Sequence, residues 1–128
     1  MMLGMTKPSI TVYGIPNCDS VKKARAWFAG QGLDYVFYDF KKAGVPAEKL
    51  PLWLASAGRD VLINRQGTTW RKLDSAVQAS VQDDASATDL MLAQASVIKR
   101  PVVEWTSKGT THTSVGYCPD VWQKWMAD

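Results

Sequence analysis

The sequence predicts a single α/β domain over residues 1–128, in which helices cover a mixed four-stranded sheet and a helical segment is inserted. Three observations favour this class. The length of 128 residues is that of one domain. The first 40 residues have the pattern strand, helix, strand, and the chain returns to two strands and a helix after an Ala- and Leu-rich middle. We therefore expect a core at about residues 9–43 and 96–128, with the helical insertion at about 44–95.

The composition excludes several classes of protein. Hydrophobic residues make up 46% and charged residues 21%, which is ordinary for a globular chain. A net charge of +3 is too small to indicate nucleic-acid binding. No apolar run approaches the ~18 residues of a membrane helix, and residues 1–10 lack the pattern of a secretory signal. We expect a cytoplasmic protein with reduced cysteines and without nucleic-acid or membrane partners.

The first segment predicts a strand, a helix and a second strand. Residues 9–13 (SITVY) are β-branched and aromatic, as in a buried strand. Asn17 is the expected N-cap of the helix, with Cys18 in its first turn. The apolar positions then recur at helical spacing, at Val21, Ala24 and Phe28. Residues 34–40 (DYVFYDF) form the second strand, and a connection of this length favours a right-handed unit with parallel strands.

The middle segment predicts helices. Residues 46–57 are expected to be helical, with Leu50, Trp53 and Leu54 on one face. Residues 60–73 are less regular and indicate a short helix followed by a loop around Gly67. Asp83 or Asp84 is the expected cap of a helix to about Gln94, whose inward positions are Ala87, Leu90, Met91 and Ala95.

The last segment predicts a hairpin and a helix. Residues 101–105 (PVVEW) and 110–115 are strand-like, and Lys108-Gly109 between them favours a tight turn. A final helix begins at Tyr117 or Pro119 and runs to Met126.

Cys18 is the sharpest chemical feature. The first amides of a helix have no internal partners, and the helix dipole places partial positive charge there. Both effects favour the nucleophilic thiolate over the thiol. The alternative is a small buried residue at a strand–helix corner. A C-x-x-C pair is absent, because the residue three positions after Cys18 is Val21. Cys118 can approach Cys18 only through the fold. It is either a resolving thiol or an ordinary residue near the last helix.

Arginines form the second feature. Arg100 directly precedes Pro101, which restricts it to extended geometry. A guanidinium there, or at Arg65, can bind an oxyanion or a carboxylate with two hydrogen bonds, although either side chain can also be a solvated surface group. His112 is expected to be an exposed strand residue, with pairing to a cysteine as the alternative. Two cysteines and one histidine at these spacings predict no metal site.

Three segments in this order resemble the ArsC family of arsenate reductases and their relatives. They are residues 11–28 (TVYGIPNCDSVKKARAWF), 62–73 (LINRQGTTWRKL) and 98–103 (IKRPVV). The run GTTWRKLD at residues 67–74 is typical of the YffB-type subgroup, which is associated with glutathione-dependent thiol reduction. The resemblance covers roughly residues 9–127.

The resemblance implies a thioredoxin-like, glutaredoxin-type fold with an inserted helical subdomain. It implies that Cys18 is the catalytic nucleophile and that Arg65 and Arg100 contact an oxyanion or glutathione. Asn17 and Pro101 are grouped with them as substrate-binding positions, Pro101 as a cis-proline. The expected partners are glutathione or glutaredoxin and a small thiol or oxyanion substrate, with glutathione as co-substrate and no tightly bound cofactor.

The sequence departs from arsenate reductases at one point. Those enzymes carry a third arginine where this chain has residues 111–117 (THTSVGY), and a site with one cation fewer holds an arsenate dianion less well. Two hypotheses follow. One is a thiol-dependent oxidoreductase with a single nucleophilic cysteine. The other is an Spx-like binding module that docks a partner such as RNA polymerase, although the C-x-x-C switch of many such regulators is broken here by Val21.

Overall fold

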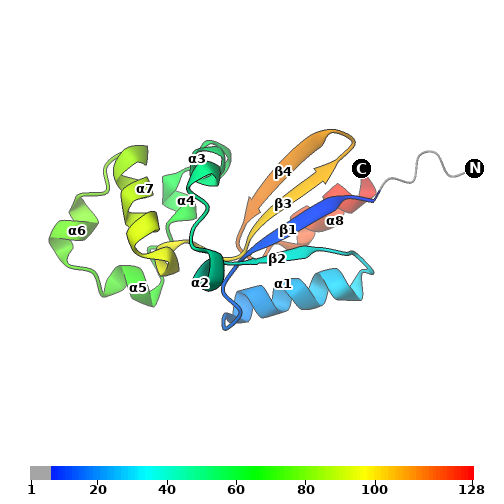
Figure 1. Ribbon diagram of the computed structural model, residues 1–128, viewed down its shortest axis with the longest axis horizontal. Coiled ribbons are helices and arrows are strands. Elements are labelled where there is room, and N and C mark those ends of the chain that lie inside the picture. The colour runs from blue at the N-terminus through cyan, green and yellow to red at the C-terminus, as the bar shows by residue number, and fades with distance from the viewer. Residues whose placement is uncertain (1–6) are drawn as a thin grey trace, which may run out of the picture. The chain divides into compact units, whose positions relative to one another are not determined.

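The computed structural model describes residues 7–128, which divide into two compact units. The sheet unit comprises the described residues up to Asp39 together with Arg100–Asp128, and the helical unit comprises Phe40–Lys99. All four strands belong to the sheet unit (Figure 1). The junctions differ by about four residues from the boundaries near 43 and 96 that the sequence suggested. No helix within residues 7–128 is long and apolar enough to cross a membrane.

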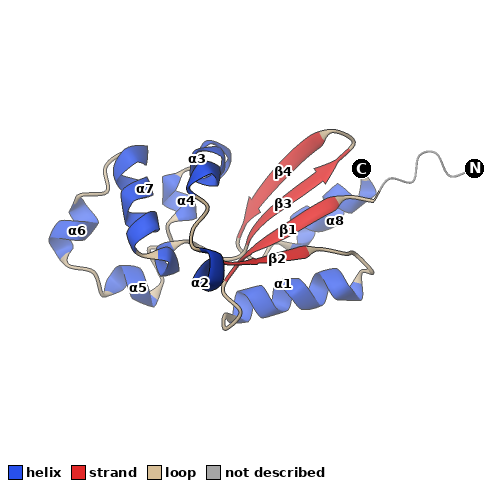
Figure 2. Ribbon diagram, viewed as in Figure 1, coloured by secondary structure: helices blue, strands red, loops and turns tan. Residues whose placement is uncertain are grey.

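The sheet is mixed and four-stranded, as predicted (Figure 2). Its order is β2-β1-β3-β4; β1 and β2 are parallel, and the other two pairs are antiparallel. The second strand is shorter than expected, because Phe40 already begins the short helix α2 (Phe40–Ala43). The strands are β1 (Ser9–Gly14), β2 (Val36–Asp39), β3 (Val102–Ser107) and β4 (Thr110–Val115).

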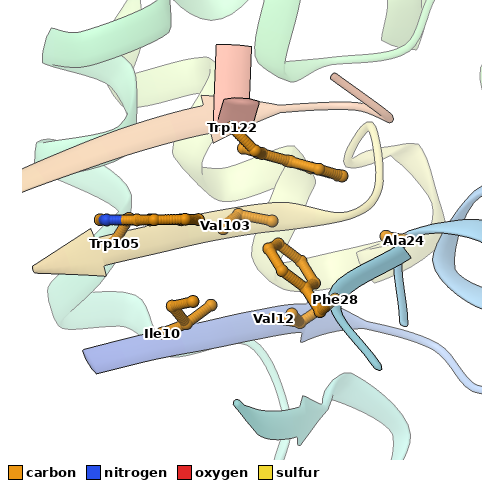
Figure 3. Packing of buried hydrophobic residues seen from close by; sticks show 7 residues of the cluster. All are labelled: Ile10, Val12, Ala24, Phe28, Val103, Trp105 and Trp122. Carbon is orange, nitrogen blue, oxygen red and sulfur yellow. The ribbon is translucent and has the colours of Figure 1, made fainter. Parts of the chain in front are cut away.

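Two helices pack on one face of the sheet. Helix α1 spans Asp19–Gly30 and α8 spans Pro119–Ala127. Alternate residues of β1 and β3 point toward both helices, since strand side chains alternate between faces. The rings of Phe28 and Trp122 lie 4.7 Å apart and join the two helices over the sheet. Figure 3 shows the cluster: Ile10, Val12, Ala24, Phe28, Val103, Trp105 and Trp122.

The hairpin between β3 and β4 has the predicted two-residue turn. Lys108 and Gly109 have φ values of 54° and 78°, the left-handed geometry of a type I′ turn. Ser107 pairs with Thr110 across this turn, so the register runs unbroken to the Val102–Val115 pair at the other end of the hairpin. This register determines which residues meet at the end of the sheet where β1 finishes.

The helical unit contains more helices than the sequence indicated. The predicted helix over residues 46–57 begins as a 3₁₀ turn (Ala47–Lys49) and continues as α3, whose first turn accommodates Pro51. Helices α5 and α6 were not predicted: α5 begins directly after Gly67, where a loop was expected. Both are too short for a helical period to show in the sequence. The helices are α3 (Leu50–Ala57), α4 (Arg59–Leu62), α5 (Thr68–Arg71), α6 (Ser75–Ala79) and α7 (Asp84–Ala93), and a 3₁₀ turn follows at Ala95–Val97.

Helix α7 has the predicted acidic N-cap. The Asp83 carboxylate accepts hydrogen bonds from the backbone N–H and the hydroxyl of Ser86, at 2.8 and 2.7 Å. The Ser86 hydroxyl in turn meets the backbone N–H of Asp83 at 3.1 Å, which completes a capping box. These bonds hold the pKa of Asp83 below its ordinary value, the backbone bond most strongly.

A buried hydrogen bond links the sheet to α8 and generates a first prediction. Trp122 Nε1 donates to Ser114 Oγ at 2.8 Å. Ser114 is a polar residue that is buried in the core. Replacing Ser114→Ala leaves the indole N–H without its acceptor in the core. We expect a loss of about 1–3 kcal/mol in the free energy of unfolding, measured by urea denaturation.

The double variant Ser114→Ala/Trp122→Phe is the control, because it removes both partners of this bond. Coupling between the two substitutions in a double-mutant cycle is expected. Strict additivity would show that the bond contributes nothing specific.

Candidate active site

Three chain segments meet at one end of the sheet unit. Tyr13 near the end of β1 pairs with Val102 at the start of β3, which in turn pairs with Val115 at the end of β4. The backbone N–H of Gly116 donates to the carbonyl of Pro101 at 2.8 Å and extends this alignment beyond the strands. The loop that leads from β1 to Cys18 and the segment that leads into β3 therefore lie at the same sheet end.

Cys18 is the N-cap of α1, not a first-turn residue. The prediction that Asn17 is the N-cap is wrong by one position, because Pro16 and Asn17 form a bend and the helix begins at Asp19. Cys18 is extended, with φ −143° and ψ 125°, and its carbonyl accepts from the Lys22 N–H at 2.9 Å. The residue Asn17 is exposed to solvent.

The N-cap position determines what the Cys18 sulfur can do. An N-cap side chain lies beside the first amides of its helix, whose N–H groups have no partner within the helix. The thiol of Cys18 makes no capping hydrogen bond, is half-buried and forms no disulfide. The first-turn amides and the helix dipole place partial positive charge beside this sulfur.

Arg100 and Val21 of α1 both lie beside Gly14 at the end of β1. A Cβ placed on Gly14 would lie 2.7 Å from Cγ2 of Val21 and 3.8 Å from Cβ of Arg100. Val21, three residues after Cys18, is fully buried. Arg100 is itself half-buried, and its Nε atom is buried. Arg100 is thus a half-buried residue at the same sheet end as Cys18.

Pro101 is buried next to Arg100, and the peptide bond between them is cis. The resemblance to the ArsC family implied this geometry. The structure therefore brings Asn17, Cys18, Arg100 and Pro101 to one end of the sheet unit.

Arg65, the remaining predicted site residue, belongs to the helical unit. It lies in the turn between α4 and α5 and is exposed. One guanidinium nitrogen lies 3.0 Å from Oδ1 of Asp60, and the guanidinium carbon lies 5.3 Å from the centre of the Trp70 ring. Two contacts thus orient the side chain of Arg65 within its own unit.

Cys118 and His112 are engaged in structural contacts. Cys118 is the N-cap of α8, and its sulfur lies 3.3 and 3.5 Å from the carbonyl oxygens of Val115 and Gly116. His112 is not the exposed residue that was expected: it is half-buried and stacks on Trp125, with ring centres 5.2 Å apart. Residues 7–128 contain no group of three or more His, Cys, Asp or Glu side chains arranged to hold a metal ion.

Gly14 allows the close approach of α1 to the end of β1, whereas the sequence indicated it only as the end of a strand. A methyl group there meets the stiff, β-branched side chain of Val21, which has no room to move. We expect Gly14→Ala to lower the free energy of unfolding by about 1–3 kcal/mol, measured by chemical denaturation.

Gly30→Ala is the matched control for this prediction. No atom lies within 4 Å of a Cβ at Gly30, which sits at the last position of α1, so we expect that variant to be neutral or slightly stabilising. Equal effects of the two substitutions would contradict a steric constraint at Gly14.

Known proteins resemble this chain over most of its length. A model of the ArsC family matches residues 13–125. A solved protein named YffB (PA3664) is 44% identical, with a TM-score of 0.81, over 91% of this chain and 97% of that one. A solution structure of an arsenate reductase (ArsC) related protein from Brucella melitensis is 46% identical, with a TM-score of 0.67, over 92% and 94%. An uncharacterised protein of Haemophilus influenzae is 39% identical over 94 residues, 73% of this chain and 82% of that protein.

Proposed function

The chain belongs to the ArsC family, with a thioredoxin-like fold and a likeness to YffB-type members, and we propose that it is a glutathione-coupled thiol reductase. The family and the arsenate reductase-related relatives support a thiol-dependent oxidoreductase at the level of the family. The finer proposal is that the thiolate of Cys18 is the single catalytic nucleophile. The observation that carries it is the position of Cys18 at the N-cap of a 12-residue helix, half-buried, at the sheet end that also holds Arg100.

The proposed reaction has two exchange steps that balance. The Cys18 thiolate attacks the glutathione sulfur of a mixed disulfide R–S–S–G, forms a Cys18–S–S–G bond and releases RS⁻, which takes up a proton. A second glutathione thiolate then attacks the glutathione sulfur on Cys18, forming GSSG and restoring the Cys18 thiolate. The net cycle reduces the substrate sulfur to a thiol and oxidises one glutathione thiol, so it requires no second cysteine and no tightly bound cofactor.

The other predicted residues act on substrate position in this proposal. Arg100 supplies a planar, permanently charged group for the carboxylate or sulfur-bearing anion, and Asn17 and Pro101 contact the bound peptide from the neighbouring loop and strand start. Arsenate is not proposed as the substrate, because residues 111–117 hold no arginine.

The proposal is tested by following glutathione-dependent reduction of a glutathionylated peptide, with oxidised glutathione measured through glutathione reductase and NADPH. We expect Cys18→Ser to reduce turnover to the uncatalysed rate. Cys118→Ser is the matched control and should stay within about twofold of wild type, because that sulfur contacts carbonyls of its own loop.

Two results would contradict the mechanism. Loss of turnover in Cys118→Ser, with a trapped mixed disulfide on Cys18, would make Cys118 the resolving thiol. Full activity in Cys18→Ser would show that Cys18 is not the nucleophile. A wild-type protein without turnover that binds RNA polymerase would support the Spx-like docking module instead.

Arg100 generates a separate kinetic prediction. A charge-assisted contact contributes about 1.5–3 kcal/mol, so Arg100→Met should lower kcat/KM by roughly 10- to 150-fold. Methionine keeps an apolar stem for the half-buried position, which separates loss of charge from loss of packing. Arg100→Lys should recover only part of the activity because an ammonium lacks the planar fork.

Steady-state kinetics with thermal melts on the same samples measure this effect. If Arg100→Met melts like wild type and keeps its kcat/KM, the anion contact lies elsewhere and Arg100 is a packing residue.

A further inference from the structure

A pocket of about 240 Å³ lies within the sheet unit, at the end of β3 and β4 where the hairpin turns. We call it the hairpin pocket. Pockets that enclose a drug-sized ligand have about 300–1,000 Å³, so this one has room for a single ring. Its lining includes the rings of Trp105, His112 and Trp125 and two exposed charged residues, Lys108 and Asp128.

The three rings are held by the packing of the sheet unit. Trp105 and His112 pair directly across the hairpin, so their side chains lie on the same face of the sheet. Trp125 of α8 packs against both: its ring centre lies 5.7 Å from that of Trp105 and 5.2 Å from that of His112. The aromatic wall of the hairpin pocket is therefore fixed by the hairpin register and by α8.

The wall also contains a buried hydrogen-bond donor that is not used. Trp105 is only 1% exposed, yet its Nε1–H has no acceptor among residues 7–128. The buried Trp122 shows the usual situation, since its Nε1–H donates to Ser114. Figure 3 shows the indole nitrogen of Trp105 at the end of the ring that points along β3 toward the hairpin, away from Val103. The donor is therefore directed toward the pocket and lacks an acceptor there.

The charged residues of the pocket favour a neutral ligand. The Lys108 ammonium donates to the backbone carbonyl of Asp128 at 3.0 Å, and the Asp128 side chain adds a carboxylate. A ligand with a charge of either sign therefore meets a like charge in the lining. The indole N–H can only donate, so the matching ligand group is an acceptor.

We propose that the hairpin pocket binds a neutral, flat, single-ring molecule with a carbonyl or ring-nitrogen acceptor, of which an aromatic amide is the type. The ring packs against Trp125 and His112, and the acceptor takes the hydrogen bond of Trp105 Nε1. This site is separate from the candidate active site. Val102, at the sheet end near Cys18, and Ser107, at the hairpin, are five residues apart along β3, or about 17 Å.

The test is a titration of the isotope-labelled protein with benzamide, followed by NMR of the indole N–H groups. The chain has six tryptophans, and we expect saturable shifts of the indole signals of Trp105 and Trp125 alone. Benzamidinium has the same shape but carries a cationic NH₂ group in place of the oxygen, so it cannot accept from Trp105. It should bind about 2- to 12-fold more weakly, the range for one neutral hydrogen bond. Benzoate keeps an acceptor but adds a negative charge and should also bind more weakly.

Two variants test the aromatic wall. Trp125→Leu should weaken the binding of benzamide by about 2- to 12-fold, the range for one aromatic contact. Trp27→Leu is the matched control, because Trp27 is another half-buried tryptophan and lies outside the pocket, and it should bind like wild type. Thermal melts on both variants check that they are folded.

Three results would overturn the proposal. They are an unmoved Trp105 indole signal, equal affinities for benzamide and benzamidinium, and equal effects of Trp125→Leu and Trp27→Leu. The comparison of ligands uses the unaltered protein, so it decides the matter even if Trp125→Leu fails to fold. Binding is measured without turnover, so a protein that is inactive as a reductase would leave this result standing.

Discussion

The close approach at Gly14 is the constraint on which the candidate active site depends. The end of β1 has no side chain there, and the space is taken by Val21 from the first turn of α1 and by the stem of Arg100. Any larger residue would push the helix away from the strand, and with it the N-cap that presents Cys18. The missing Cβ therefore lets the first turn of α1, with Cys18 at its N-cap, lie close to the end of β1. The register of three strands then adds Gly116 to the same end of the sheet through its bond to Pro101.

Much of the sheet unit could be predicted, because its signals are local. Residues 9–13 alternate and are β-branched, and Lys108-Gly109 adopts the turn that its sequence favours. The exact N-cap of α1 could not be predicted. Asparagine is preferred over cysteine at an N-cap, but Asn17 belongs to the bend that begins at Pro16. Cys18 is therefore the last extended residue before the helix. The stacking of His112 on Trp125 depends on α8 lying over β4, which no local pattern encodes.

Less of the helical unit could be predicted from the sequence. Helix α7 was predictable because Asp83 caps it and the buried positions Ala87, Leu90 and Met91 recur at helical spacing. Helices α5 and α6 have four and five residues, too few for a period to be detected. The approach of Lys99 to Arg65 could not be predicted. Both residues line one small pocket because Ile63 pairs with Ile98 in an isolated bridge, a contact between residues 35 positions apart.

The two ends of the helical unit join the sheet unit beside a single residue. Asp39, the last residue before the helical unit, pairs with Gly14 in the parallel ladder. Arg100, the first residue after it, has its Cβ 3.8 Å from the place that a Cβ on the same glycine would take. A segment whose ends are so close behaves as a domain inserted into a permissive loop: its length changes the closure entropy of the surrounding chain only slowly. Such a graft can exchange, lengthen or diversify its helices across generations without disturbing the strand pairing beneath. The strand pairing that positions Cys18 and the helices between Asp39 and Arg100 are thus separable in evolution, each carried by its own part of the chain.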